Sequence, residues 1–338
     1  MSGPRLVALA RTLVAAAAAL TLPTAAAAAQ IYRVAEMTAP QIRALDRAKT
    51  VVILPGGVLE EHGPHLPAYT DGYVNAWVTE RLAEAIVARP GWAVLVFPMM
   101  PTGDGGFNQA GGRNTFPGSY GVRTSTLRAV YMDLATELGE QGFRWAFIMH
   151  GHGSPLHNRA LHQAGDYFRD TYGGHMVNLP GLNLPPLPSG QRAAEPALTA
   201  AERQEVGIDL HAGLGETSRM LFVRPDLVDR GFRQLAPITV TPAVLQRGYA
   251  GLQAMDAIRA PDWPGYISSP RLASAAFGAA TLQNRANSYN AAALRILDGL
   301  DERTLSREDG GPPVTDFPYY TEVERKQRAW MDRQGIKP

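Results

Sequence analysis

Short β-branched apolar runs alternate with longer amphipathic stretches along residues 51–179, and this alternation limits the possible folds more than any other feature of the chain. The run VVIL at residues 51–54 is closed by a proline and is predicted to be a buried strand. Residues 72–89 carry apolar side chains at helical spacing and end before Pro90 and Gly91, which predicts a helix. The pattern then repeats, with strands predicted over residues 92–97, 145–149 and 176–179, and helices over residues 124–141 and 158–172.

Strands and helices that alternate at this spacing are typical of right-handed βαβ units. We therefore predict an α/β fold: a three-layer α/β/α arrangement with a mostly parallel central sheet, forming a single domain over residues 30–302. Thr124 or Ser125 is the expected N-cap of the second helix. Residues 180–196 are rich in proline and are predicted to be an irregular surface loop. The C-terminal tail, residues 303–338, is expected to contain one short helix near residues 320–331.

Residues 1–29 differ in kind from the rest of the chain. Arg5 and Arg11 precede or border an almost entirely apolar run over residues 13–22, and small residues follow up to Ala29. This order is typical of a secretory signal peptide with cleavage near Ala29, so we expect an exported protein, periplasmic or secreted. A transmembrane anchor is disfavoured because the run is shorter than the roughly 20 residues that span a bilayer. No membrane span is expected after cleavage.

Charge and cysteine content narrow the range of partners and chemistries. The 338 residues carry 32 basic and 31 acidic side chains, a formal net charge of +1, so no overall field attracts nucleic acid or an anionic membrane. We expect a small-molecule partner and no nucleic acid. The chain has no cysteine, which excludes thiolate chemistry and leaves histidine and carboxylate side chains as the ligands for any metal ion.

Acidic and histidine side chains are concentrated in the loop after the first predicted strand, namely Glu60, Glu61, His62, His65 and Asp71. Glu60 and His62 are two residues apart and point to the same side of an extended backbone, and Asp71 can return to them if the Gly-Pro and Leu-Pro pairs bend the chain. Two carboxylates and an imidazole suit zinc, manganese or iron, and a shared carboxylate typically holds two ions roughly 3.5–4 Å apart. The alternative is a polar turn that faces water, but five such residues in one Gly/Pro-rich loop favour a metal site.

Two further polar clusters are less specific. His150 and His152 follow the third predicted strand, beside glycines that allow a sharp turn, and they supply what a multi-ligand site needs from a second strand end. Residues 209–218 contain Asp209, His211 and Glu216. There Glu216 has an equally good explanation as an acidic residue in the first turn of a helix. Ligands bind at the carboxyl ends of strands in parallel sheets, where these clusters are expected.

Together these stretches resemble the creatininase family, also called creatinine amidohydrolase-like. Residues 55–71 (PGGVLEEHGPHLPAYTD) are similar to its long first motif, with only the serine position changed, to Val58. Residues 150–154 (HGHGS) and 211–218 (HAGLGETS) resemble its second and third motifs. Two shorter stretches, FPGS at 116–119 and SPRLASAAFG at 269–278, extend the resemblance over roughly residues 50–300.

The resemblance implies a centre with two divalent ions, zinc, manganese or iron, in which Asp71 bridges the ions. The implied metal ligands are Glu60, His62, Asp71 and His152. Creatininase itself carries a glutamate at the position of Ser154, so the resemblance leaves the second ion open. His211 and Glu216 match motif positions near the reacting centre and are assigned catalytic roles in proton transfer and substrate orientation. Substrate-binding roles are assigned to His65, His150 and Ser154.

The expected reaction is hydrolysis of a non-peptide C–N bond, in a cyclic or formyl-type amide, by metal-activated water. Two alternatives stay open at this point. One is a lactonase, or a peptidase acting on a modified peptide, with the same metal centre. The other is a periplasmic small-molecule binding protein without catalysis. The resemblance also implies a homo-oligomer, with a hexamer as the expected form.

Overall fold

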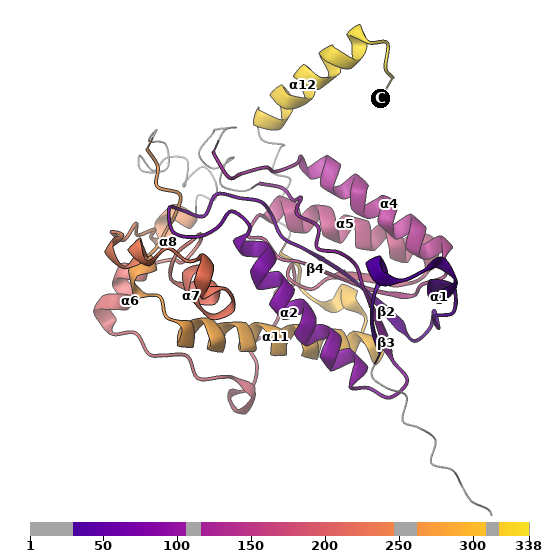
Figure 1. The fold of residues 1–338 in the computed structure, drawn as a ribbon, viewed down its shortest axis with the longest axis horizontal. Helices are drawn as coiled ribbons and strands as arrows, with labels where there is room; N and C mark the ends of the chain where they lie inside the picture. The colour runs from indigo at the N-terminus through magenta and orange to yellow at the C-terminus, as the bar shows by residue number, and fades with distance from the viewer. Residues whose placement is uncertain (1–29, 106–115, 247–261, 309–317, 338) are drawn as a thin grey trace, which may run out of the picture.

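A parallel sheet of five strands forms the centre of the molecule (Figure 1). The computed structural model describes residues 30–105, 116–246, 262–308 and 318–337. The strands are β1 (Gln30–Arg33), β2 (Thr50–Gly56), β3 (Ala93–Val96), β4 (Trp145–His150) and β5 (His175–Asn178), in the order β1-β3-β2-β4-β5. Every pairing is parallel, which confirms the predicted sheet. The expected signal peptide, residues 1–29, lies outside the described residues.

Helices cover both faces of this sheet, because side chains of the buried strand β2 alternate between two hydrophobic cores. Val51 and Ile53 belong to one core, and Val52 and Leu54 belong to the other. The first core is closed by α2 (Thr70–Val87), α7 (Leu214–Val223) and α11 (Ala275–Leu297), and the second by α4 (Thr124–Glu140) and α5 (Pro155–Tyr172). The predicted three-layer α/β/α architecture is therefore confirmed.

Each predicted strand and helix agrees with the structure to within three residues at either end. The N-cap of α4 is Arg123, so the prediction of Thr124 or Ser125 was wrong. Thr124 is the first helical residue, and its hydroxyl instead donates a hydrogen bond of 2.7 Å to Oδ2 of the buried Asp104. The strand β1 was not predicted, because its four residues, QIYR, show no continuous apolar run.

The remaining elements are short or peripheral. They are η1 (Val34–Glu36), α1 (Ala39–Arg43), η2 (Ser189–Gln191), α6 (Ala200–Val206), η3 (Pro225–Leu227), η4 (Arg230–Gln234), α8 (Pro242–Leu245), η5 (Pro270–Leu272), η6 (Glu302–Thr304) and α12 (Pro318–Arg333). The Pro-rich stretch 180–196 is irregular apart from η2, as expected. The helix expected near residues 320–331 is α12, drawn in yellow at the edge of Figure 1. Among the described helices, none combines the length and the apolar character that crossing a bilayer requires.

Two close approaches determine where the functional loops lie. Gly56, the last residue of β2, pairs with His150, the last residue of β4, so the loops that follow both strands start at the same edge of the sheet. Gly278 of α11 lies against the backbone of Ser218 in α7, where an added Cβ would come within 1.9 Å of the Ser218 carbonyl oxygen. This glycine lets α11 pack tightly on α7 beside that edge.

Candidate metal centre

Three carboxylates and three imidazoles converge at the carboxyl ends of β2 and β4. The six residues are Glu60, His62, Asp71, His152, His211 and Glu216. They form three overlapping groups, in each of which the ligand atoms lie within 4.8 Å of one another. Glu60, His62 and His211 are almost fully buried, with at most 4% of their surface exposed. The structure thus brings together all four predicted metal ligands and both predicted catalytic residues.

The loop after β2 folds so that the two ends of the segment 60–68 lie side by side. The backbone N–H of Glu60 donates to the carbonyl oxygen of Ala68 at 2.9 Å, which closes the loop. Gly63 has a φ of 71°, a left-handed conformation that glycine adopts without strain. Asp71 follows in the first turn of α2 and therefore faces Glu60 and His62 across the closed loop. The predicted return of Asp71 toward these two residues is confirmed.

The orientation of the His62 ring is set by one backbone contact. Its Nδ1 lies 2.8 Å from the carbonyl oxygen of Glu60, and since a carbonyl only accepts, Nδ1 carries the proton. Nε2 then faces Oδ1 of Asp71 at 3.8 Å and Oε2 of Glu216 at 3.6 Å. A histidine whose outer nitrogen donates to a carbonyl is the usual arrangement of a metal ligand.

The second carboxylate oxygen of Asp71 faces a different histidine. Nδ1 of His152 lies 3.1 Å from Oδ2 of Asp71 and 3.5 Å from Oε2 of Glu60. Asp71 therefore directs one oxygen toward His62 and the other toward His152. Burial lowers the pKa of His152, but Glu60 and Asp71 outweigh burial and raise it to about 9. The pKa of Asp71 falls to about 2, because the hydrogen bond and charge of His152 outweigh the effect of burial.

His211 and Glu216 reach the centre from the loop before α7 and from its first turn. His211 donates from Nε2 to the carbonyl oxygen of Glu61 at 2.6 Å, and its Nδ1 lies 3.9 Å from Oε2 of Glu60 and 4.0 Å from Oε2 of Glu216. Between them, Ala212 has a φ of 47°, and its N–H donates to Oε2 of Glu216 at 2.6 Å. A non-glycine residue in the left-handed region is strained, and such strain is concentrated at functional sites.

This set of donors fits divalent metal ions. Three carboxylates this close repel one another in a buried site, so they need cations to compensate their charge. Without a metal, part of that compensation falls to histidines: burial raises the pKa of Glu216, but the nearby His62 and His211 lower it more. Imidazole and carboxylate together suit zinc, manganese and iron. Glu60, His62 and Asp71 each belong to two of the three groups, and the two oxygens of Asp71 face different histidines, as those of a bridging carboxylate would.

The residues assigned to substrate binding are packed behind this centre. His65 bonds through Nε2 with the hydroxyl of Thr217 at 2.9 Å, and His150 donates from Nε2 to the carbonyl oxygen of Thr102 at 3.1 Å. Burial lowers the pKa of each imidazole to about 4. Ser154 is 1% exposed and caps α5 by accepting from the N–H of His157. None of the three lines the cavity described next, and their contact with a substrate stays a prediction.

A cavity of about 260 Å³ opens beside the metal centre. Four of the six converging residues line it, namely Asp71, His152, His211 and Glu216. Three further side chains complete this part of the lining: Arg219 of α7, and Arg285 and Tyr289 of α11. These last three residues were not predicted from the sequence. Arg219 directly follows the third motif, which offered a signal, whereas Arg285 and Tyr289 lie in α11 beyond the last stretch of resemblance, residues 269–278.

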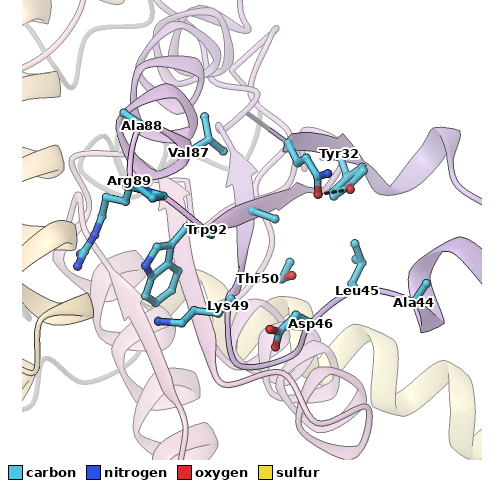
Figure 2. Close-up of a pocket in the computed structure, with 14 residues that line it drawn as sticks. Tyr32, Ala44, Leu45, Asp46, Lys49, Thr50, Val87, Ala88, Arg89 and Trp92 are labelled. Carbon is cyan, nitrogen blue, oxygen red and sulfur yellow. Dashed lines mark hydrogen bonds between the residues drawn. The ribbon is translucent and has the colours of Figure 1, made fainter. Parts of the chain in front are cut away.

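Another hollow, of about 470 Å³, lies at the opposite end of the sheet. Figure 2 shows it at the amino ends of β1, β2 and β3, where Tyr32, Lys49 and Trp92 border it. Lys49 places its ammonium 4.5 Å from the centre of the Trp92 ring. None of the six converging residues lines this hollow, so it has no part in the candidate metal centre.

Known proteins resemble the chain over most of its length. The family profile described as "Creatininase: Creatinine amidohydrolase" matches residues 35–292. The creatinine amidohydrolase of Pseudomonas putida is 30% identical over 66% of this chain and 81% of its own length. A mycofactocin precursor peptide peptidase of Mycobacterium ulcerans is 28% identical over 67% of this chain and 78% of its own length. The solved structure described as "Creatininase Mn" superposes with a TM-score of 0.56 and 25% identity, covering 79% of this chain and 99% of that one.

Proposed function

Because the chain belongs to the creatininase family of amidohydrolases, we propose that it is a metal-dependent hydrolase that cleaves a non-peptide C–N bond in a small cyclic or formyl-type amide. The observation that carries this proposal is the convergence of three carboxylates and three imidazoles around Asp71. The cavity of about 260 Å³ beside them suits a small molecule.

Two overlapping groups of residues are proposed to hold one ion each. Glu60, Asp71 and His152 form the first group, and His62, Asp71 and Glu216 form the second. When bound, the ions lower the pKa of a coordinated water to about 7 and polarise the amide carbonyl. In this assignment Glu216 is a metal ligand rather than the proton carrier that its motif position suggested, because its Oε2 lies 3.6 Å from the ligating nitrogen of His62.

His211 is then the best placed residue to move a proton. Its Nε2–H is fixed on the carbonyl oxygen of Glu61, which leaves Nδ1 directed toward Glu60 and Glu216. An imidazole can accept a proton during attack and return it to the leaving nitrogen, which is the task of a general acid–base group. In this proposal the three carboxylates, His62 and His152 hold the ions, and His211 transfers the proton.

Metal analysis combined with a substrate panel tests the proposal. The mature protein, reconstituted with Mn²⁺ or Zn²⁺ and then desalted, is assayed for bound metal and for hydrolysis of lactams, cyclic ureides, formamides, lactones and short peptides. We expect about two ions per chain and turnover of at least one cyclic or formyl amide. Retention of less than one ion, or turnover of lactones alone, would count against it. Bound metal without any hydrolysis would favour the non-catalytic binding protein.

A peptidase acting on a modified peptide is the second candidate. The similarity to a mycofactocin precursor peptide peptidase, over 78% of that protein, favours it. The same metal centre serves either bond, because a peptide bond is also an amide. Peptides in the panel separate the two candidates: cleavage of peptides with no turnover of cyclic amides would select the peptidase.

Export and assembly complete the proposal. We propose that residues 1–29 are removed as a signal peptide, so that the mature chain begins at Gln30, the first residue of β1. We also propose that the protein is a homo-oligomer, with a hexamer expected from its family. Mass spectrometry of the protein recovered from the periplasm or the medium tests the first proposal, and light scattering after size-exclusion chromatography tests the second.

A further inference from the structure

Two arginines face the cavity beside the metal centre, and the hydrolysis mechanism uses neither of them. Arg219 lies on α7, one turn after Glu216, and Arg285 lies on α11, which packs against α7. They are close enough for the charge of Arg285 to lower the pKa of Arg219. Two like charges placed together beside a cavity are unfavourable unless an anion compensates them.

Arg219 has part of this compensation within the protein. Its Nη2 lies 3.6 Å from Oε1 of Glu216, and the carboxylate of Asp209 is a further electrostatic partner. Burial, and next the charge of Arg285, lower the pKa of Arg219 only to about 10, so its guanidinium stays charged at neutral pH. Nevertheless its Nε is buried and has no hydrogen-bond partner among the described residues. One donor of this buried side chain is therefore unused.

Arg285 makes no hydrogen bond and no ion pair with another described residue, although it is only partly exposed. Tyr289, one helical turn later, lines the same cavity and adds a phenolic hydroxyl. Glu308 also lines the cavity, but its side chain is exposed to solvent and forms no ion pair with Arg285. Of the two arginines that line the cavity, Arg285 is therefore the one that has no carboxylate partner among the described residues.

We propose that Arg285, with the charge of Arg219 beside it, binds a carboxylate group of the substrate, so that the natural substrate is an amide bearing a carboxylate. This inference rests on the proposed function, because it takes the metal centre as the place where the amide is held. The carboxylates of Asp71, Asp209 and Glu216 line the same cavity, which disfavours a doubly charged phosphate and favours a single negative charge. A planar carboxylate also matches the fork of a guanidinium.

Two matched chelators test the inference without turnover. Propionohydroxamate and the monohydroxamate of succinic acid share a metal-binding group and differ only in a terminal carboxylate. Calorimetric titration of the metal-loaded protein gives the dissociation constant of each. A charged hydrogen bond contributes about 1.5–3 kcal/mol, so we expect the carboxylated probe to bind at least about tenfold more tightly to the wild type.

Variants of α11 assign that preference to one side chain. Arg285→Gln is expected to bind both probes equally, with its affinity for propionohydroxamate unchanged, which also shows that the variant is folded. Arg285→Lys should retain part of the preference. The control is Arg295→Gln, because Arg295 lies on the same helix, is exposed and does not line the cavity; it should keep the full preference.

The outcomes separate this inference from the proposed function. Equal affinities for the two probes in the wild type, or a preference that survives in Arg285→Gln, would overturn the carboxylate site while leaving the metal centre intact. Failure of both probes to bind, in a protein that retains no metal, would overturn the metal centre and the carboxylate site together.

Discussion

Oε2 of Glu216 lies 3.6 Å from Nε2 of His62, although one residue comes from the first turn of α7 and the other from the loop after β2. This contact is relevant to residue 154, the position at which the second motif differs most from that of creatininase. The residue there, Ser154, is buried and caps α5, so it offers no carboxylate. We propose that Glu216 supplies one from a different element, so that the second proposed group of ligands is complete.

Glu216→Gln is the direct test of this substitution of ligands. Glutamine keeps the shape and can still accept from the N–H of Ala212, but it removes the charge. We expect the metal content to fall from about two ions to about one per chain, and turnover to fall by more than the roughly 10–100-fold that loss of an outer-shell partner costs. Glu137→Gln, an exposed position on α4, is the control. A variant with two ions and normal turnover would show that Glu216 is not a ligand.

Asp71→Asn should have a larger effect, because Asp71 belongs to both groups of ligands. We expect the loss of both tightly held ions and of all measurable turnover, with an unchanged circular dichroism spectrum. Metal content is measured by mass spectrometry after desalting. Asp133→Asn on the exposed side of α4 should leave both quantities unchanged. Near-normal activity of Asp71→Asn in metal-defined buffer would contradict the proposed centre.

Removal of metal should also destabilise the fold. A ligand that binds only the folded state at about 1,000 times its dissociation constant adds about 4 kcal/mol to the free energy of unfolding. We expect a chelator to lower the melting temperature, and added Mn²⁺ or Zn²⁺ to restore it. Asp71→Asn should not respond to either treatment. Equal melting temperatures of the wild type with and without chelator would argue against tightly bound ions.

The buried His65 is expected to contribute to the loss of folding stability at acidic pH. Burial lowers the pKa of His65 to about 4 in the folded protein, below its ordinary value of 6.5. Below pH 6.5 the unfolded chain therefore binds more protons at this site, and stability is lost as the pH falls toward 4. The full shift corresponds to about 3 kcal/mol.

His65→Gln isolates this contribution, since glutamine can still bond with Thr217 but does not titrate. The free energy of unfolding is measured with urea at several pH values between 7 and 4.5. We expect the wild type to lose stability relative to the variant as the pH falls, by up to about 3 kcal/mol. Parallel curves for the two proteins would mean that His65 takes up its proton without unfolding.

Gly278→Ala tests the close packing of α11 on α7. The added methyl group would lie 1.9 Å from the carbonyl oxygen of Ser218, so the two helices must move apart. Overpacking of this kind costs about 1–3 kcal/mol, which chemical denaturation can measure. Gly190→Ala is the control, because nothing lies within 4 Å of the added atom. If both variants are equally stable, the two helices adjust without cost.

Local patterns predicted the sheet and the first part of the centre. The apolar run of β2 gave a buried strand, and the rule that ligands collect at the carboxyl ends of parallel strands placed Glu60, His62 and Asp71 near His152. The structure shows why this works: Gly56 and His150 are paired neighbours, so the two loops leave from adjacent strand ends.

Contacts between distant elements could not be predicted in the same way. The position of Glu216 beside His62 depends on how α7 packs against α11, and therefore on Gly278, which no periodicity indicates. Arg285 carries no local signal either, since a single arginine in a helix usually faces water. Its relation to the cavity is visible only in three dimensions.

The cavity takes its helical lining from α2, α7 and α11, and none from α4 or α5. The two sides of the sheet therefore contribute differently to the shape of the cavity. Apart from His157 at the start of α5, whose ring contacts that of His152, substitutions on α4 and α5 can be chosen to raise stability without changing the lining of the cavity. A mutant library designed to change substrate selectivity can be confined to a few positions on α7 and α11. The helices α4 and α5 on the other face of the sheet then stay constant in every variant.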